Sequence, residues 1–329
     1  MEIMYQRCAG IDVHKENVVC SVRISESRTR HETKTFATTT RELLALCDWL
    51  ESLRCTHVAM ESTGVYWRPV WHILEGHFQL LLANPAHMRN VPGRKTDVLD
   101  ATWIADLLAH GLLQASFIPD EPIAELRDLM RTRKQFTAEK ARHIQRIQKT
   151  LEDANIKATM AMTDLTGIAG RAILEALIGG ETNPERLATL GSRTLRKVGK
   201  AQLVECLRGF VKPRHRFFLR LHYDHILHLE TAIRAIEEEV KRLIVPFQEA
   251  VDRLQTIPGI SETTAQTMIA EMGVEMNRFP TSGHLVSWVG LCPRNDESAG
   301  KRRSVRIRPG TPWLKTALVQ AAWAATRCA

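Results

Sequence analysis

The first third of the chain alternates strand-like and helix-like segments in an order that few folds use. Residues 7–24 contain two apolar runs joined by the polar turn His14–Asn17, and the more polar run 31–39 follows as a third strand. Leucines at helical spacing then mark a helix behind Thr38–Thr40. A strand, a helix, a strand and a helix follow at 57–63, 65–76, 78–85 and 94–108. Three antiparallel strands followed by αβ crossovers predict a mixed sheet with helices on both faces.

After Pro119 and Pro122 no strand pattern appears, and long helices are predicted instead. Between residues 224 and 254, apolar residues recur alternately every three and four positions, which is a heptad seam with charges outside. Pro246 is expected to bend or end this helix. The seam needs a covering partner: either the helix at about 121–153, which would make an antiparallel arm, or the same helix of a second subunit. The seam residues are Ile226, Leu229, Ile233, Ile236, Val240, Leu243 and Phe247.

These patterns predict three domains. The first is an RNase H-like α/β domain at 1–118. A helical coiled-coil arm with a small helical insertion follows at 119–252, and a mainly α domain occupies 253–329. Within the last domain, the apolar turn Ile257–Ile260 and the cap residue Ser261 resemble the hairpin of helix-hairpin-helix modules, whose backbone N–H groups hold a phosphate. A plain packing corner between two helices explains the same residues about as well.

The charge of the chain points to a polyanionic partner. Its formal net charge is +8, its pI is near 9.3, and its basic residues gather in runs at 127–149, 193–220 and 301–308. A single run is more often a solvated surface than a binding site, but three runs in one chain favour nucleic acid. Our candidates for this contact are Lys95, Arg196, Lys197, Lys200, Arg214, Arg216, Lys301, Arg302 and Arg303.

Membrane and secretory signals are absent from the sequence pattern. No run of eighteen uncharged apolar residues occurs, and the N-terminus lacks an apolar segment behind a basic start. We therefore expect a cytoplasmic protein with no membrane partner, associated with the nucleoid when it acts on DNA. The seven cysteines are scattered and never spaced as CxxC, which indicates reduced structural thiols and no zinc site.

Four acids lie near the ends of predicted elements. Asp12 closes the first strand, Glu61 lies near the end of the fourth, and Asp97 and Asp100 are at the head of the last α/β helix. In an RNase H-like sheet the first and fourth strands are neighbours and this helix packs across them, with both of its acids on one face. Four carboxylates repel unless cations neutralise them, and such oxygen-rich sites select Mg²⁺ or Mn²⁺. Taken singly, each acid also has a structural explanation, such as capping the helix or complementing its dipole.

Six segments together resemble the DEDD transposases of bacterial insertion sequences of the family numbered 110 (IS110). In chain order they are GIDVHKENV, MESTGVYWRPV, NPAHMRNVPGRKTDVLDATWIADLL, IPGISETTAQTMIAEMG, LVSWVGLCPRNDESAGKRRS and WLKTALVQAAWAA. The resemblance covers essentially the whole chain. It implies a RuvC-like N-terminal domain, a coiled-coil arm and a C-terminal transposase domain.

The resemblance also implies roles for individual residues and partners. Asp12, Glu61, Asp97 and Asp100 match the DEDD metal ligands, and Ser298 matches the serine that attacks DNA and carries it covalently, with Ser304 as its nearest competitor. Similar recombinases use a structured noncoding guide RNA, encoded by the element, that pairs with target and donor DNA. They assemble as dimers to tetramers, in which the metal domain of one subunit works with the serine of another.

Two features depart from the family pattern. Ser261 replaces the second glycine of the expected hairpin. The chain also ends at AATRCA, inside an apolar helix that relatives continue for several turns. We therefore expect a shortened C-terminal domain.

Three other functions compete with a serine-using, RNA-guided DNA recombinase. A RuvC-like nuclease or junction resolvase would use the acids to activate water and would ignore Ser298. A non-catalytic nucleic-acid-binding protein on a decayed fold is disfavoured because all four acids are present. A sugar-kinase-like or actin-like ATPase also begins with GID in a strand, but it needs a second glycine-rich phosphate loop that this sequence lacks.

Overall fold

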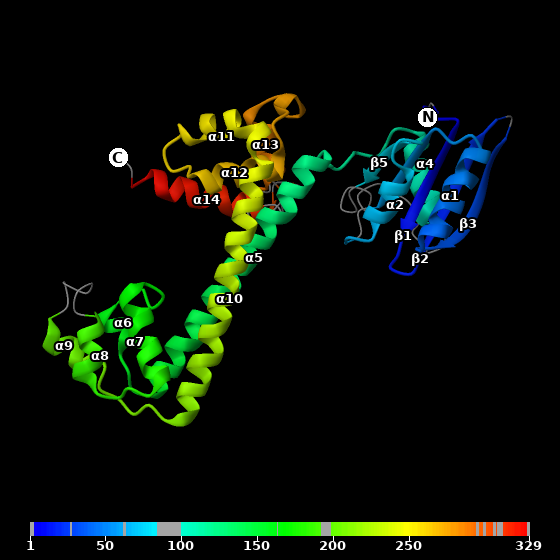
Figure 1. Ribbon diagram of the computed structural model, residues 1–329. Helices are drawn as coiled ribbons and strands as arrows, with labels where there is room; N and C mark the ends of the chain where they lie inside the picture. The colour runs from blue at the N-terminus through cyan, green and yellow to red at the C-terminus, as the bar shows by residue number, and fades with distance from the viewer. Residues whose placement is uncertain are drawn as a thin grey trace. The chain divides into compact units, whose positions relative to one another are not determined.

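The chain forms two compact units, Met1–Ile118 and Pro119–Ala329 (Figure 1). The computed structural model describes residues 3–26, 28–61, 64–83, 100–162, 164–191, 199–293, 296–298, 301–304, 307 and 312–327. Among these residues, no helix combines the length and apolar character needed to cross a membrane.

The first unit contains a five-stranded mixed sheet with the order β3-β2-β1-β4-β5 (Figure 1). β1, β2 and β3 pair antiparallel, whereas β4 lies parallel to β1 and β5 parallel to β4. This strand order and these directions are those of an RNase H-like fold, as the sequence predicted. The strands are β1 Arg7–Val13, β2 Asn17–Ser25, β3 Thr29–Ala37, β4 His57–Glu61 and β5 Gln79–Ala83.

Helices cover both faces of this sheet. The side chains of β1 therefore alternate between two buried surfaces. Ala9, Ile11 and Val13 belong to the larger core, together with residues of α1 (Thr40–Ser52) and α2 (Trp67–Leu74). On the other face, Cys8 packs with residues of α4 (Asp100–Ala109). A strand buried on both faces explains why residues 8–13 show no alternation between apolar and polar residues.

The second unit is built on a long antiparallel helix pair, α5 (Glu121–Asp153) and α10 (Pro213–Leu243) (Figure 1). Ile123 near the start of α5 shares a core with Val240 near the end of α10, and Leu151 near the end of α5 shares another with Leu219. The heptad seam is therefore covered by α5 of the same chain. The helix begins earlier than the seam suggested and ends at Leu243, and Pro246 lies in the following 3₁₀ turn.

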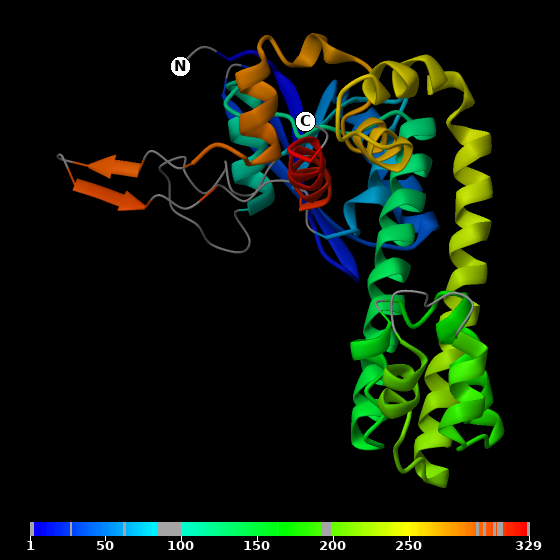
Figure 2. The ribbon, with the colours of Figure 1, turned by 90° about the vertical axis from the view of Figure 1, so that its left-hand side faces the viewer.

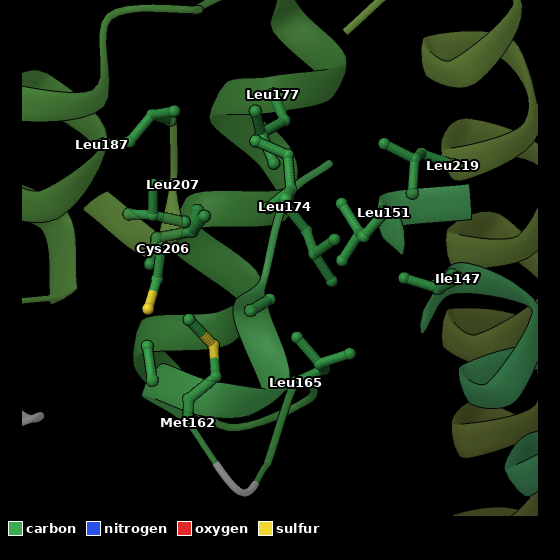
Figure 3. Packing of buried hydrophobic residues seen from close by; sticks show 14 of the residues in the cluster. Ile147, Leu151, Met162, Leu165, Leu174, Leu177, Leu187, Cys206, Leu207 and Leu219 are labelled. Atoms are coloured by element: carbon green, nitrogen blue, oxygen red, sulfur yellow. The ribbon is translucent and has the colours of Figure 1, made fainter. Parts of the chain in front are cut away.

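A small helical insertion closes the far end of this helix pair. It consists of α6 (Ala158–Ala161), α7 (Ile168–Gly179), α8 (Pro184–Gly191) and α9 (Lys200–Cys206). Figure 3 shows Leu174 and Leu177 of α7 in one apolar cluster with Leu151 and Leu219 of the long helices. Because these leucines are at most 2 % exposed, the insertion is fixed to the helix pair by burial of apolar surface.

The C-terminal part of the second unit packs against the opposite end of the helix pair. Ser261 caps α12, and its Oγ accepts the N–H of Thr264 at 3.3 Å, as predicted. Gly259 has φ +85°, and a Cβ there would lie 2.3 Å from the carbonyl oxygen of Ala321, so α14 contacts the turn directly. The helical elements are α11 Gln248–Gln255, α12 Glu262–Met272, a 3₁₀ turn Met276–Arg278, α13 Ser282–Val289 and α14 Pro312–Ala325.

The structure corrects one expectation for this region. No strand was expected after Pro119, but β6 (Asp296–Ser298) and β7 (Lys301–Ser304) form an antiparallel hairpin (Figure 2). Residues 296–298 and 301–304 include no apolar residue, so the alternation that marks a strand in a sequence is missing.

Candidate functional site

Asp12 and Glu61 lie side by side at one edge of the sheet. The parallel register pairs Ile11 of β1 with Met60 of β4, and the two acids are the next residue of each strand. Ile11 and Met60 belong to the core under α1 and α2. Because successive side chains point to opposite faces, both acids project from the other face, which α4 covers.

α4 places a third acid at the same edge. A Cβ on Gly10 would lie 2.2 Å from the carbonyl oxygen of Ala101, and the Cys8 thiol donates to the carbonyl of Ala105 at 3.5 Å. The helix therefore runs antiparallel to β1 and begins beside the end of that strand. Asp100 is its first residue and is half-buried. Asp97 lies outside the described residues.

These three acids lie at the same end of β1, β4 and α4. Asp12 is only 8 % exposed, and the Nε2 atom of His14 lies 3.2 Å from its Oδ2 atom. Clustered carboxylates in a protected site repel one another, and a divalent cation relieves that repulsion. Carboxylate oxygens are hard ligands that suit Mg²⁺ and Mn²⁺ rather than thiophilic metals. The chemistry of this donor set therefore fits the predicted cation.

Three contacts that the sequence analysis missed hold α4 in this position. Gly10 lets the helix backbone touch β1, and a glycine inside a strand is a recognisable signal of such an approach. Arg23 of β2, which is 5 % exposed, donates from Nε to Asp106 of α4 at 2.9 Å. His31 of β3 approaches the same carboxylate at 3.0 Å. The charge pair had no sequence signal because its partners are far apart along the chain.

Ser298 belongs to the other unit. It is the last residue of β6, where its Cα pairs with that of Lys301, and Ser304 pairs with Asp296. Both serines therefore lie in the hairpin of β6 and β7. Ser298 and the acids belong to different units, and a contact between them is a prediction.

The residues predicted to contact nucleic acid differ in their surroundings. Lys95, Arg196 and Lys197 lie outside the described residues, whereas Lys200 is exposed at the start of α9. Arg214 pairs with Asp153 at 3.0 Å, and Arg216 donates to the carbonyl of Gly180 at 3.5 Å. Both of these cations therefore have partners within the unit. Lys301, Arg302 and Arg303 follow one another in β7.

Much of the basic run on α5 is neutralised internally. Arg131 makes a bidentate pair with Glu271 of α12, at 2.7 Å for both contacts. Arg133 pairs with Glu237 of α10 at 2.6 Å, and Lys140 approaches Glu230 at 3.5 Å. The charge pattern along the chain does not reveal these pairs, because helix packing brings each acid to α5 from more than 80 residues away. Arg142, Arg146 and Lys149 stay exposed along one face of α5.

One mixed group of metal-binding side chains lies on the opposite face of the sheet domain. Potential ligand atoms of Cys47, Glu51 and His77 lie within 4.8 Å of one another. The His77 Nδ1 atom is 2.8 Å from the Glu51 carboxylate, an ion pair that explains the arrangement without a cation. Burial, with Glu51 and Asp48 nearby, raises the pKa of the Cys47 thiol, which disfavours the thiolate that a metal needs. We assign this group no function.

Two family models match the chain. A DEDD transposase model of the IS110 type, described as "Transposase", covers residues 9–156, and a model described as "Transposase IS116/IS110/IS902 family" covers residues 251–329. The chain belongs to the IS110 family of DEDD transposases. The first match contains all four acids of the predicted tetrad, and the second contains Ser298.

Individual relatives agree with this assignment. The transposase for insertion sequence element IS1111A of Coxiella burnetii is 33% identical over 116 residues, which span 35% of this chain and 31% of that protein. A probable family 20 transposase of Pseudomonas aeruginosa is 23% identical over 322 residues, 97% of this chain and 80% of that protein. The chain thus aligns with about a third of the Coxiella protein.

A solved structure is also similar at a lower level. Thermus thermophilus RuvC matches with 16% identity and a TM-score of 0.26, over 33% of this chain and 99% of RuvC. The strand order and directions, rather than this weak similarity, identify the RNase H-like fold of the IS110-family chain.

Proposed function

We propose that the chain is a metal-dependent transposase that cuts and rejoins DNA by phosphoryl transfer. The observation that carries this proposal is the pairing of Ile11 with Met60, which puts Asp12 and Glu61 next to each other beside the N-terminus of α4. Family membership adds the reaction class, since the acids fall inside the matched DEDD segment.

Asp12, Glu61, Asp97 and Asp100 would hold Mg²⁺ or Mn²⁺. When bound, two such ions would stabilise both the attacking and the leaving oxygen of a phosphoryl transfer. The chain's own contribution is to orient the carboxylates. The helix–strand contact at Gly10 fixes the acid-bearing end of α4 against β1, and the Arg23–Asp106 pair holds the later part of the helix on β2.

Ser298 is our proposed nucleophile. Its hydroxyl oxygen bonds to the phosphorus, the bond from phosphorus to one deoxyribose oxygen breaks, and that oxygen leaves with a proton. A serine hydroxyl needs help with deprotonation. We propose that this help comes from the acidic site of another subunit. Lys301, Arg302 and Arg303, on the paired strand, are suited to hold DNA phosphates.

The proposed partners are target and donor DNA, a structured guide RNA and further copies of the chain, from dimer to tetramer. The net charge of +8 and the exposed cations Arg142, Arg146 and Lys149 support binding of nucleic acid. The guide RNA and the serine linkage rest on the family resemblance. We also propose that 119–252 and 253–329 act as separate domains, the first as a coiled-coil arm.

A covalent adduct assay tests this function. The complex of protein and RNA is incubated with labelled target DNA and Mg²⁺ and then denatured, and we expect label on the protein. Ser298→Ala should remove the label, whereas Ser304→Ala, its matched control in the same hairpin, should keep it. Cleavage that leaves free ends and no adduct would mean that water is the nucleophile, and the nuclease function would replace the recombinase function.

A further inference from the structure

A cavity of about 240 Å³ lies between α5, α12 and α14 in the second unit. We call it the Trp313 pocket, and it is lined among others by Arg131, Lys134, Thr263, Thr267, Gln320 and Trp313. Pockets for drug-sized ligands usually measure roughly 300–1,000 Å³. The Trp313 pocket is therefore sized for one small planar group rather than for a whole cofactor.

The charge of the pocket is positive once its internal pair is counted. Glu271, whose side chain is 3 % exposed, is matched by both guanidinium contacts from Arg131. Arg127 also donates to the carbonyls of Ala270 and Glu271 at 2.9 and 2.7 Å. Lys134 has no carboxylate within ion-pairing distance among the described residues. Burial lowers the pKa of Lys134, a shift that a bound anion would oppose.

An aromatic ring forms one side of this cationic site. The Lys134 ammonium lies 5.3 Å from the centre of the Trp313 ring, and the Arg131 guanidinium lies 5.5 Å from it. Both cations come from α5, one helical turn apart. An indole ring beside a guanidinium and an ammonium is the combination on which unpaired nucleobases stack while their phosphates are neutralised.

The N-terminal turn of α12 supplies polar groups to the same pocket. Thr263 and Thr267 line it, and the Thr267 hydroxyl donates to the carbonyl of Thr263, which leaves its oxygen able to accept. Thr263 is the second residue of α12, where backbone N–H groups have no partner within the helix. These N–H groups and the helix dipole favour a phosphate at this position.

We propose that the Trp313 pocket binds one unstacked nucleotide of a single-stranded nucleic acid, with its base against Trp313 and its phosphate at Lys134. The proposal rests on the proposed function only in requiring a nucleic-acid partner. Arg133 and Thr137 line both this pocket and a second cavity that Lys140, Arg171 and Arg234 also border. Glu230 and Glu237 in that cavity pair with Arg133, Lys140 and Arg171, so the exposed Arg234 is the cation that a neighbouring phosphate would use there.

Binding of short oligonucleotides to the full chain tests the proposal without catalysis. Fluorescence anisotropy with labelled single-stranded DNA and RNA twelve-mers is measured without divalent metal, in an Asp12→Asn background. We expect Trp313→Leu to weaken binding roughly 5- to 150-fold, the loss expected for one stacking aromatic, and Trp313→Phe to retain most of it. Trp323→Leu is the matched control, since Trp323 is 68% exposed on the same helix.

Three further measurements separate the outcomes. Lys134→Met should reduce the salt dependence of binding by about one unit of slope, as loss of one phosphate contact requires, whereas Trp313→Leu should leave the slope unchanged. A single abasic site, moved along the oligonucleotide, should weaken binding to the parent at one position and have no further effect on Trp313→Leu. The DNA and RNA arms identify which strand uses the pocket.

Equal affinities of Trp313→Leu and Trp323→Leu for both oligonucleotides, with circular dichroism unchanged, would overturn the pocket assignment. So would a uniform abasic effect at every position. Neither result depends on the adduct assay. Failure of that assay alone would reject the recombinase function and leave the pocket standing.

Discussion

Asp12 and Glu61 each come directly after a residue of the pair Ile11–Met60, which joins the parallel neighbouring strands β1 and β4. Both acids therefore leave the sheet at the same edge and on the same face, and α4 begins beside them with Asp100. A pair of adjacent, protected carboxylates is an unfavourable arrangement for a domain that holds no cation. The common position of Asp12, Glu61 and Asp100 thus favours one shared metal-binding role over a separate structural role for each acid.

The first prediction concerns Asp12 itself. Asp12→Asn should reduce DNA strand exchange by at least about 100-fold, because one charged oxygen ligand is lost, while the thermal unfolding midpoint stays the same or rises. Strand exchange on labelled DNA and unfolding by circular dichroism are the measurements. Asp48→Asn is the matched control, since Asp48 is exposed on α1 on the other side of the sheet. Retention of strand exchange in Asp12→Asn would remove Asp12 from the site.

The second prediction concerns Gly10, where α4 touches β1. Gly10→Ala puts a methyl group 2.2 Å from a carbonyl oxygen and 2.4 Å from the N atom of Ala105, so the helix must move away. We expect a loss of roughly 1–3 kcal/mol in the free energy of unfolding, with a loss of activity because Asp100 moves too. Gly283→Ala is the control, since the nearest heavy atom to its added Cβ is 3.6 Å away. A neutral Gly10→Ala would contradict this packing.

The third prediction is a pH dependence of the α5–α10 pair. The Nδ1 atoms of His143 and His222 lie 3.2 Å apart, and the ring that accepts this hydrogen bond must be neutral. Burial, with further effects of Arg146 and His225, lowers the pKa of both histidines. Nearby Glu139 acts in the opposite direction on His143. The fold therefore favours the neutral form of both rings.

The sign of this effect follows from proton linkage. A histidine with a lowered pKa in the folded state binds more protons when unfolded, so stability rises with pH between the two pKa values. Stability should be full above the unfolded value of about 6.5, and it should fall as pH drops through that value towards the folded-state pKa. Urea unfolding at pH 7.5 and 5.5 should show a smaller difference in His143→Gln than in the parent. His228→Gln, at an exposed position of α10, should keep the parent's difference; equal differences in all three proteins would refute the assignment.

The fourth prediction concerns the covered seam. Ile233 is 9 % exposed on α10, so Ile233→Asp places an unpaired carboxylate among apolar side chains of the helix pair. We expect a loss of at least about 3 kcal/mol in stability and a marked loss of helicity, since a buried charge is costly without a partner. Ala235→Asp, at an exposed neighbouring position, should keep both properties. Sedimentation of the two variants tests separately whether the arm also joins subunits.

The sequence by itself determined the order and nature of most elements. The apolar run of β1, the cap at Ser261 and the end of α10 before Pro246 depend on residues within a few positions of one another. Backbone geometry and nearest-neighbour chemistry fix such features, so a local pattern carries them. The strand order of the sheet was also predictable, because few topologies satisfy the rules for short, right-handed connections.

Only the tertiary structure decided which charges are free and where a cavity opens. Arg131 and Glu271 are 140 residues apart, yet their bidentate pair removes a cation that the sequence counted towards a nucleic-acid surface. Trp313 gains its two cations only because α14 and α12 pack on α5. Such contacts depend on which surfaces meet after folding, and the energy of a charge depends on its partners and its burial rather than on its place in the chain.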